Sequence, residues 1–178
     1  MLLIFDEVAT GFGRTGHRFV ADLVLPDILV LGKALTGGYI GHAVTVANHK
    51  VYQGFYSDDP DHALMHGPTF MGNALACSVA LRSIQLFEEG DYLSRIARIQ
   101  QICRLELADL DDPRIKRCAS WGMCLYRSKR RVGTWRDSRS LPGRRGVFSR
   151  PFLRYIYSMV PYVINGGGTG SGDRPTMK

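Results

Sequence analysis

Short apolar runs that end in polar residues open the chain. Residues 2–5 form a continuous apolar run that ends at Asp6, and residues 28–31 form a second run that ends just before Lys33. A third strand is predicted over residues 42–47. An uninterrupted apolar run such as 2–5 is typical of a parallel strand that is buried on both faces. The pattern therefore predicts an α/β sheet with polar groups at the carboxyl ends of its strands.

Two amphipathic helices are predicted after these strands. Apolar side chains recur at helical spacing between Gly72 and Glu89, and Gly90 lies where a helix stop is expected. A second helix is predicted from Asp91, a good capping residue, to about Leu107. The middle of the chain is therefore expected to be helical.

Residues 122–146 differ from the rest of the chain because Arg and Ser dominate and no helix or strand period survives. The eight basic residues and one acidic residue of this block account for the whole net charge of +7. We predict irregular structure there, renewed order up to residue 164, and a flexible glycine-rich tail over residues 165–178.

Composition narrows the class of protein. The 178 residues, 45% of them apolar, are enough for one domain with a hydrophobic core. No apolar run approaches the about 20 residues of a membrane span, and the first residues lack a basic leader, so we predict a cytoplasmic protein without membrane contact. The four cysteines show no metal-ligand spacing, which predicts reduced thiols and no metal site.

The strand ends carry the candidate chemistry. Asp6 and Lys33 each follow a predicted strand and precede glycine-rich backbone, which places opposite charges at the sheet edge where ligands usually bind. Each residue also has an ordinary explanation, since Asp6 can cap a turn and Lys33 can be a solvated lysine. The two residues alone therefore leave the function open.

Three segments resemble, in this order, the class III pyridoxal-phosphate-dependent aminotransferases. They are Phe5-Asp6-Glu7-Val8-Ala9-Thr10-Gly11-Phe12-Gly13-Arg14-Thr15-Gly16, Pro26-Asp27-Ile28-Leu29-Val30-Leu31-Gly32-Lys33-Ala34-Leu35-Thr36-Gly37-Gly38 and His66-Gly67-Pro68-Thr69-Phe70-Met71-Gly72-Asn73. The sequence Gly67-Pro68-Thr69-Phe70 resembles the corresponding segment in one branch of this class. That branch forms 7,8-diaminononanoate from 8-amino-7-oxononanoate in biotin biosynthesis, with S-adenosylmethionine as amino donor.

The resemblance implies a domain organisation. Residues 1–90 would be part of the pyridoxal-phosphate-binding large domain of fold type I, and residues 91–164 a partial α+β carboxyl-terminal domain. The family chain is longer, so this chain resembles a carboxyl-terminal part of it. The likeness is absent over residues 122–146, and we hypothesise that this block is translated out of frame.

The resemblance also implies roles for individual residues. Lys33 would form the Schiff base with the cofactor, and Asp6 would pair with its pyridine nitrogen. The remaining matched positions are Val8 against the cofactor ring, Pro68 and Thr69 at its phosphate, and Gly67 and Arg150 at the substrate. In the family the phosphate loop of residues 66–69 comes from the neighbouring subunit, which implies a homodimer.

Three alternatives stay open. The chain could be another class III ω-aminotransferase, acting on ornithine or acetylornithine, or a catalytically inactive fragment. It could also be a nucleic-acid-binding module in which the eight basic residues bind the phosphate backbone of the nucleic acid and Tyr126 and Trp135 stack on its bases. The three family motifs favour an enzyme with small-molecule substrates and no nucleic-acid partner.

Overall fold

The computed structural model describes residues 1–108, 113, 115–120, 124–128 and 153–164. The chain forms two compact units, Met1–Tyr92 and Leu93–Lys178. Their boundary lies two residues beyond the predicted division at residues 90 and 91. The tail predicted over residues 165–178 lies outside the described residues.

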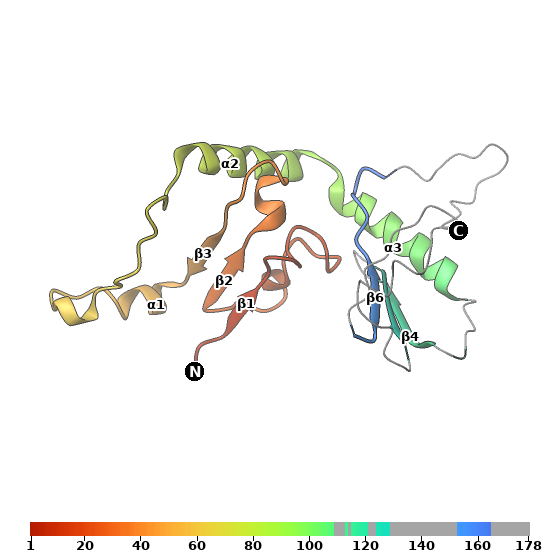
Figure 1. Ribbon diagram of the computed structural model, residues 1–178, viewed down its shortest axis with the longest axis horizontal. Coiled ribbons are helices and arrows are strands. Elements are labelled where there is room, and N and C mark those ends of the chain that lie inside the picture. The colour runs from red at the N-terminus through yellow and green to blue at the C-terminus, as the bar shows by residue number, and fades with distance from the viewer. Residues whose placement is uncertain (109–112, 114, 121–123, 129–152, 165–178) are drawn as a thin grey trace. The chain divides into compact units, whose positions relative to one another are not determined.

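A three-stranded sheet forms the first unit. Its strands are β1 (Ile4–Asp6), β2 (Ile28–Leu31) and β3 (Val44–Ala47), in the order β1-β2-β3 (Figure 1). β1 and β2 are parallel, with Asp6 opposite Val30, and β3 is antiparallel to β2. The three predicted strands are therefore confirmed.

The burial predicted for the first strand is wrong. Leu2, Leu3 and Ile4 are 46%, 43% and 57% exposed, although the apolar run was expected to be covered on both faces. The reason is that β1 lies at the edge of this sheet and has β2 as its single neighbour among the described strands. A continuous apolar run cannot distinguish a central strand from an edge strand of the same composition.

Asp27 joins all three strands at the end of the sheet opposite the carboxyl end of β1. Its carboxylate accepts hydrogen bonds from the Leu3 backbone N–H at 2.8 Å and from the Asn48 side-chain amide at 2.8 Å. The Leu3 bond, then the Asn48 bond and then the positive charge of Lys50 lower the pKa of Asp27 below its ordinary value of 3.8. The ionised carboxylate is therefore the form that the fold favours.

We expect this lowered pKa to make stability fall in acid. A carboxylate whose pKa is depressed in the folded state contributes fully above its ordinary pKa and loses that contribution as the pH falls through the lowered value. The free energy of unfolding should thus decrease more steeply between about pH 5 and pH 2 in the unaltered chain than in Asp27→Asn. Denaturant titrations at several pH values measure this, with Asp58→Asn, an exposed acid, as control. Parallel pH profiles for the unaltered chain and Asp27→Asn would contradict it.

Short 3₁₀ and α-helical turns lie between the strands and after the last of them. η1 (Val20–Asp22) follows the glycine-rich loop, η2 (Lys33–Thr36) follows β2, and α1 (His49–Gln53) and η3 (Pro60–His62) follow β3. The core of the unit consists of Phe12, Leu35 and Ala80, with Phe19, Val44, Ile84 and Phe87 packed against it. The core therefore joins the glycine-rich loop, η2 and the following long helix.

That helix, α2 (Ala74–Glu89), begins and ends at recognisable signals. The Asn73 side chain accepts a hydrogen bond from the Ala76 N–H at 3.0 Å, and the Gly90 N–H donates to the Leu86 carbonyl at 3.0 Å. A Cβ atom on Gly90 would lie 2.5 Å from the Tyr92 ring, so the close approach of that ring requires glycine. The predicted helix and its stop are confirmed.

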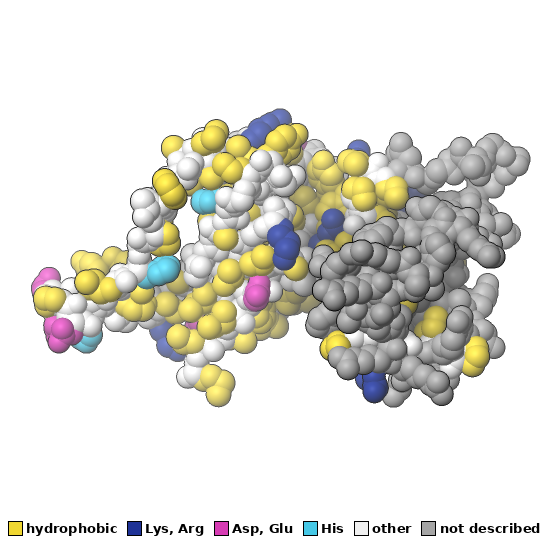
Figure 2. All heavy atoms as spheres, viewed as in Figure 1, with side chains coloured by type: hydrophobic (Ala, Val, Ile, Leu, Met, Phe, Trp, Pro, Cys, Tyr) yellow, Lys and Arg dark blue, Asp and Glu magenta, His cyan; other side chains and the backbone are white. Residues whose placement is uncertain are grey.

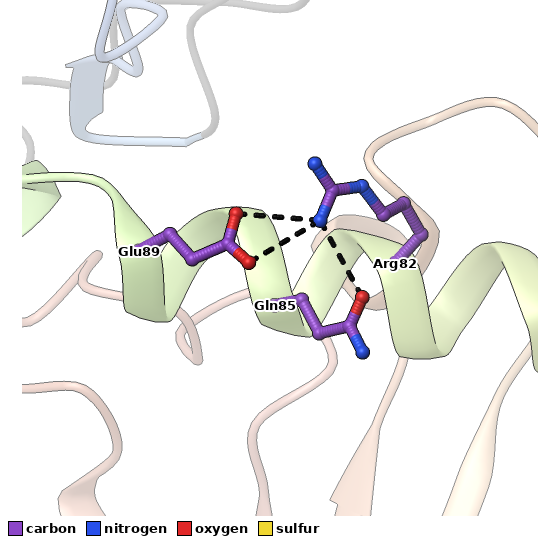
Figure 3. A network of polar contacts seen from close by, with 3 residues as sticks. All are labelled: Arg82, Gln85 and Glu89. Atoms are coloured by element: carbon purple, nitrogen blue, oxygen red, sulfur yellow. Dashed lines mark hydrogen bonds and ion pairs between the residues drawn. The ribbon is translucent and has the colours of Figure 1, made fainter.

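The outer face of α2 is solvated. Arg82 contacts Gln85 at 3.4 Å and Glu89 at 3.3 Å on successive turns (Figure 3). The side chains of Arg82 and Glu89 are both more than half exposed, so their ion pair contributes little to stability. Apolar side chains are also exposed on the first unit (Figure 2), among them Leu75 and Leu81 of this helix.

The second unit contains the second predicted helix and a small sheet. The helix is α3 (Tyr92–Ala108), and the sheet is β4 (Ile115–Ser120), β5 (Cys124–Ser128) and β6 (Tyr155–Ser158), antiparallel in that order. β5 lies inside the block predicted as irregular, and this part of the prediction is wrong. Pairing with strands on both sides stabilises a segment whose own sequence shows no strand pattern.

The expected state of the cysteines is also corrected. Cys103 on α3 is disulfide-bonded, although reduced thiols were predicted, while Cys77 on α2 is free. Spacing along the sequence could not reveal a pairing that depends on the fold. Among the described residues, no group of three or more His, Cys, Asp or Glu side chains is placed to hold a metal ion.

No described helix is both long and apolar enough to cross a membrane.

Candidate active site

The carboxyl ends of β1 and β2 form the candidate site, because parallel pairing brings them side by side. Asp6 is the last residue of β1 and lies opposite Val30, and the Glu7 N–H extends the pairing by donating to the Val30 carbonyl at 2.9 Å. Lys33 follows two residues after β2 ends. The predicted pair Asp6 and Lys33 is therefore carried on neighbouring strand ends, and both side chains are exposed.

Val8 fixes the backbone between these two strand ends. The Val8 N–H donates to Asp6 Oδ1 at 3.1 Å, which anchors the carboxylate in a local turn. Its side chain lies against Gly32, where a Cβ atom would be only 3.2 Å from Val8 Cγ1. Gly32 therefore lets the first loop pack closely against the residue that precedes Lys33.

Lys33 has an unusual backbone conformation. Its φ is +46°, in the left-handed region that L residues other than glycine rarely adopt. Such strained residues persist when the surrounding structure holds them, and they cluster at functional sites. The sequence shows a lysine here, but it gives no sign of this conformation.

Glu7 is a residue of the site region that the sequence did not distinguish from its neighbour. It is 2% exposed, and its carboxylate accepts hydrogen bonds from the Val20 N–H at 3.0 Å and the Ala21 N–H at 3.2 Å. These N–H groups belong to the first turn of η1, so Glu7 caps that turn from a distance in sequence. The acid pair after β1 thus divides into an exposed carboxylate and a buried one.

The segment with Gly67, Pro68 and Thr69 is not joined to these strand ends. It is exposed and runs as an extended arm between η3 and α2 (Figure 1). Its contact is local, since the Pro68 carbonyl accepts a hydrogen bond from the Met71 N–H at 2.9 Å. In the part of the chain that the structure describes, no hydrogen bond or ion pair links Thr69 to Asp6 or Lys33.

Two further predictions concern residues at the carboxyl side. Arg150 lies outside the described residues. Of the eight basic residues in the block 122–146, the described one is Arg127, which is half-buried on β5 and lies over the Tyr155 ring at 6.0 Å to its centroid. Arg127 therefore packs within the small sheet.

Comparison with known proteins defines the class to which this fold and site belong. The family "Aminotransferase class-III" matches residues 1–166, nearly the whole chain. The chain belongs to the class III aminotransferases, and the resemblance of the three sequence motifs is confirmed. The family match also runs through residues 122–146.

Curated relatives indicate a branch of this family. The chain is 42% identical over 171 residues to adenosylmethionine-8-amino-7-oxononanoate aminotransferase of Mycobacterium leprae, which covers 92% of this chain and 38% of the relative. It is 48% identical over 99 residues to the enzyme of the same name from Staphylococcus aureus, which covers 54% of this chain and 22% of that relative.

Solved structures agree with the fold. The adenosylmethionine-8-amino-7-oxononanoate aminotransferase of Methanocaldococcus jannaschii matches with a TM-score of 0.77 and 31% identity, over 93% of this chain and 42% of that one. The omega transaminase of Pseudomonas jessenii, solved in complex with PMP, matches with a TM-score of 0.78 and 26% identity. The chain spans about two fifths of the length of these proteins. The predicted fold class, part of an α/β fold type I transaminase, is confirmed.

Proposed function

We propose that this chain carries the lysine-bearing part of a pyridoxal-phosphate-dependent transamination site. The observation that supports this most directly is Lys33, which is strained and exposed and follows the strand that neighbours the one ending in the exposed Asp6. The names of the relatives support 8-amino-7-oxononanoate as acceptor and S-adenosylmethionine as donor, and thereby a step of biotin biosynthesis.

The residues present suit this cofactor in their chemistry. An exposed primary amine can bond covalently to an aldehyde, and an exposed carboxylate can hold a proton on a ring nitrogen. Gly32 leaves room for close packing of Val8, whose apolar side chain is suited to one face of an aromatic ring. Bound pyridoxal phosphate supplies an electron sink for the charge left when a substrate carbon loses its proton.

Lys33 is proposed to have two roles. Its Nζ atom would hold the cofactor, and the same atom would take a proton from the substrate carbon and return one. A proton carrier must reach the same point in every cycle. The position of Lys33 at the start of η2, directly beyond a sheet strand, supplies a rigid base for this long side chain.

Asp6 is proposed to keep the ring nitrogen protonated through a charge-assisted hydrogen bond. The Val8 N–H bond to Oδ1 holds the carboxylate in one orientation, so little freedom is lost when a positive group binds. Asp6 and Val8 would then contact two sides of the same ring.

The phosphate and substrate contacts complete the proposal. Pro68 and Thr69 would receive the phosphate, and Gly67 and Arg150 the substrate. Among the described residues, the arm of residues 63–73 is exposed and makes no hydrogen bond or ion pair to Lys33, which supports a role at the site of a second subunit. We therefore propose a homodimer with shared sites.

Lysine labelling tests the proposal. Pyridoxal phosphate is added to the full chain, the adduct is fixed by borohydride reduction, and peptide mapping locates it. We expect the visible absorbance band and the label at Lys33, and the loss of both in Lys33→Ala. Lys50→Ala, which removes an exposed lysine of α1, is the matched control and should retain both. Equal labelling of Lys33 and Lys50 would refute the proposal.

A further inference from the structure

The η2 turn holds Lys33 in a conformation that its own side chain does not stabilise. Among the described residues, Phe12, Lys33 and Leu153 are the non-glycine residues with positive φ. Phe12 is 4% exposed and packs in the core, whereas the Lys33 side chain is exposed. The strain at Lys33 must therefore be offset by contacts of its neighbours in the chain, among them the residues that follow it.

Three contacts fix those residues. Leu35 is 2% exposed and lies in the core with Phe12 and Ala80. Thr36 is 1% exposed, and its hydroxyl donates to the Ile40 carbonyl at 2.6 Å, which closes the loop beyond η2. The turn is thus anchored by one apolar side chain and by one buried hydroxyl.

The third contact comes from α2. The Ser83 hydroxyl donates to the Ala34 carbonyl at 3.2 Å, across 49 positions of sequence. The same carbonyl accepts the Gly37 N–H at 3.0 Å, so it is held by two donors. Ser78, one and a half turns earlier on α2, instead donates to the Ala74 carbonyl of its own helix at 2.8 Å. Ser83 therefore makes a tertiary contact where Ser78 makes a local one.

We propose that Thr36 and Ser83 are positioning residues that clamp the η2 turn and so keep the Lys33 backbone in its left-handed conformation. The role in catalysis rests on the proposed function of Lys33, but the clamp itself does not. Neither residue would contact a cofactor or a substrate, since both act through the backbone between residues 34 and 40.

A comparison of two substitutions at position 33 measures the strain without any cofactor. Glycine accepts the left-handed conformation and alanine does not, so the unfolding equilibrium constant of Lys33→Ala should exceed that of Lys33→Gly by about fivefold. In a Thr36→Val/Ser83→Ala background the turn can relax, and we expect the ratio to fall toward one. Ser78→Ala is the matched control and should leave it at about fivefold.

An unchanged ratio in the Thr36→Val/Ser83→Ala background would overturn the clamp. Ser83→Ala alone provides a second comparison, because it leaves the buried Thr36 intact and removes one donor from the Ala34 carbonyl. It should give an intermediate ratio, and a ratio equal to that of Ser78→Ala would count against the role of Ser83.

The rate at which pyridoxal phosphate bonds to Lys33 tests positioning. We expect Thr36→Val/Ser83→Ala to slow formation of the visible band by about 10-fold to 100-fold, because a displaced amine is poorly oriented. The single variant Thr36→Ser keeps a hydroxyl at position 36 and leaves Ser83 unaltered, so its rate should equal that of the unaltered chain. Ser78→Ala should not change the rate either. An unchanged rate in Thr36→Val/Ser83→Ala would overturn the positioning role. If the unaltered chain forms no band, the proposed function fails. The ratio of the unfolding equilibrium constants of Lys33→Ala and Lys33→Gly still tests whether Thr36 and Ser83 hold the turn.

Discussion

Replacement of Asp6 by Asn is expected to slow amino transfer by about 10²-fold to 10⁴-fold while the cofactor still attaches to Lys33. Asparagine keeps the Oδ1 acceptor for the Val8 N–H, so the turn after β1 should persist. It removes the negative charge, and with it the group proposed to hold a proton on the ring nitrogen. Binding and chemistry should therefore separate in this variant.

Single-turnover kinetics measure this separation. The full chain is loaded with pyridoxal phosphate and mixed with S-adenosylmethionine, and the decay of the visible band is followed. Asp22→Asn is the matched control, because the Asp22 carboxylate also accepts a local backbone N–H, that of Phe19 at 3.2 Å, but does so in η1. A decay rate in Asp6→Asn within about threefold of the control would contradict the proposed role, since general acid–base groups contribute far more.

Leu35→Ala is expected to lower the free energy of unfolding of the first unit by about 2–5 kcal/mol. Leu35 is 2% exposed and contacts the core that joins η2, the glycine-rich loop and α2. Truncation removes buried apolar surface and leaves a cavity that Phe12 and Ala80 cannot fill without moving.

Urea denaturation compares this variant with Leu81→Ala. Leu81 lies on α2 and is 62% exposed, so its truncation should change the free energy of unfolding by no more than about 0.5 kcal/mol. Similar losses for the two leucines would show that the cluster around Leu35 is not the core of this unit.

Strands and helices could be predicted from the sequence where neighbouring residues carry the signals for their start, end and period. β2 was predicted to the residue because four apolar residues stand between clear turn signals. α2 was predicted with its end because the helical spacing of its apolar residues and the stop at Gly90 agree. The family motifs likewise indicated Asp6 and Lys33, and the structure places them on neighbouring strand ends.

Features that depend on distant partners were missed. The conformation of Lys33 is imposed by Leu35, Thr36 and Ser83, and no propensity of lysine predicts it. The sequence does not distinguish Glu7 from Asp6, since both are acids after the same strand. Glu7 is buried because its carboxylate accepts hydrogen bonds from N–H groups of η1. β5 was missed because charged and hydroxyl side chains conceal a strand that exists through its two neighbours.

The exposed first strand has a consequence for how the protein behaves in concentrated solution. An edge strand offers unpaired N–H and carbonyl groups to other chains, and the side chains of residues 1–5 are apolar and carry no charge that would oppose such pairing. The exposed carboxylate of Asp6 ends the strand, and a charge at such a position opposes the stacking of like strands. A substitution that neutralises Asp6 should therefore also remove a charge that keeps neighbouring molecules apart.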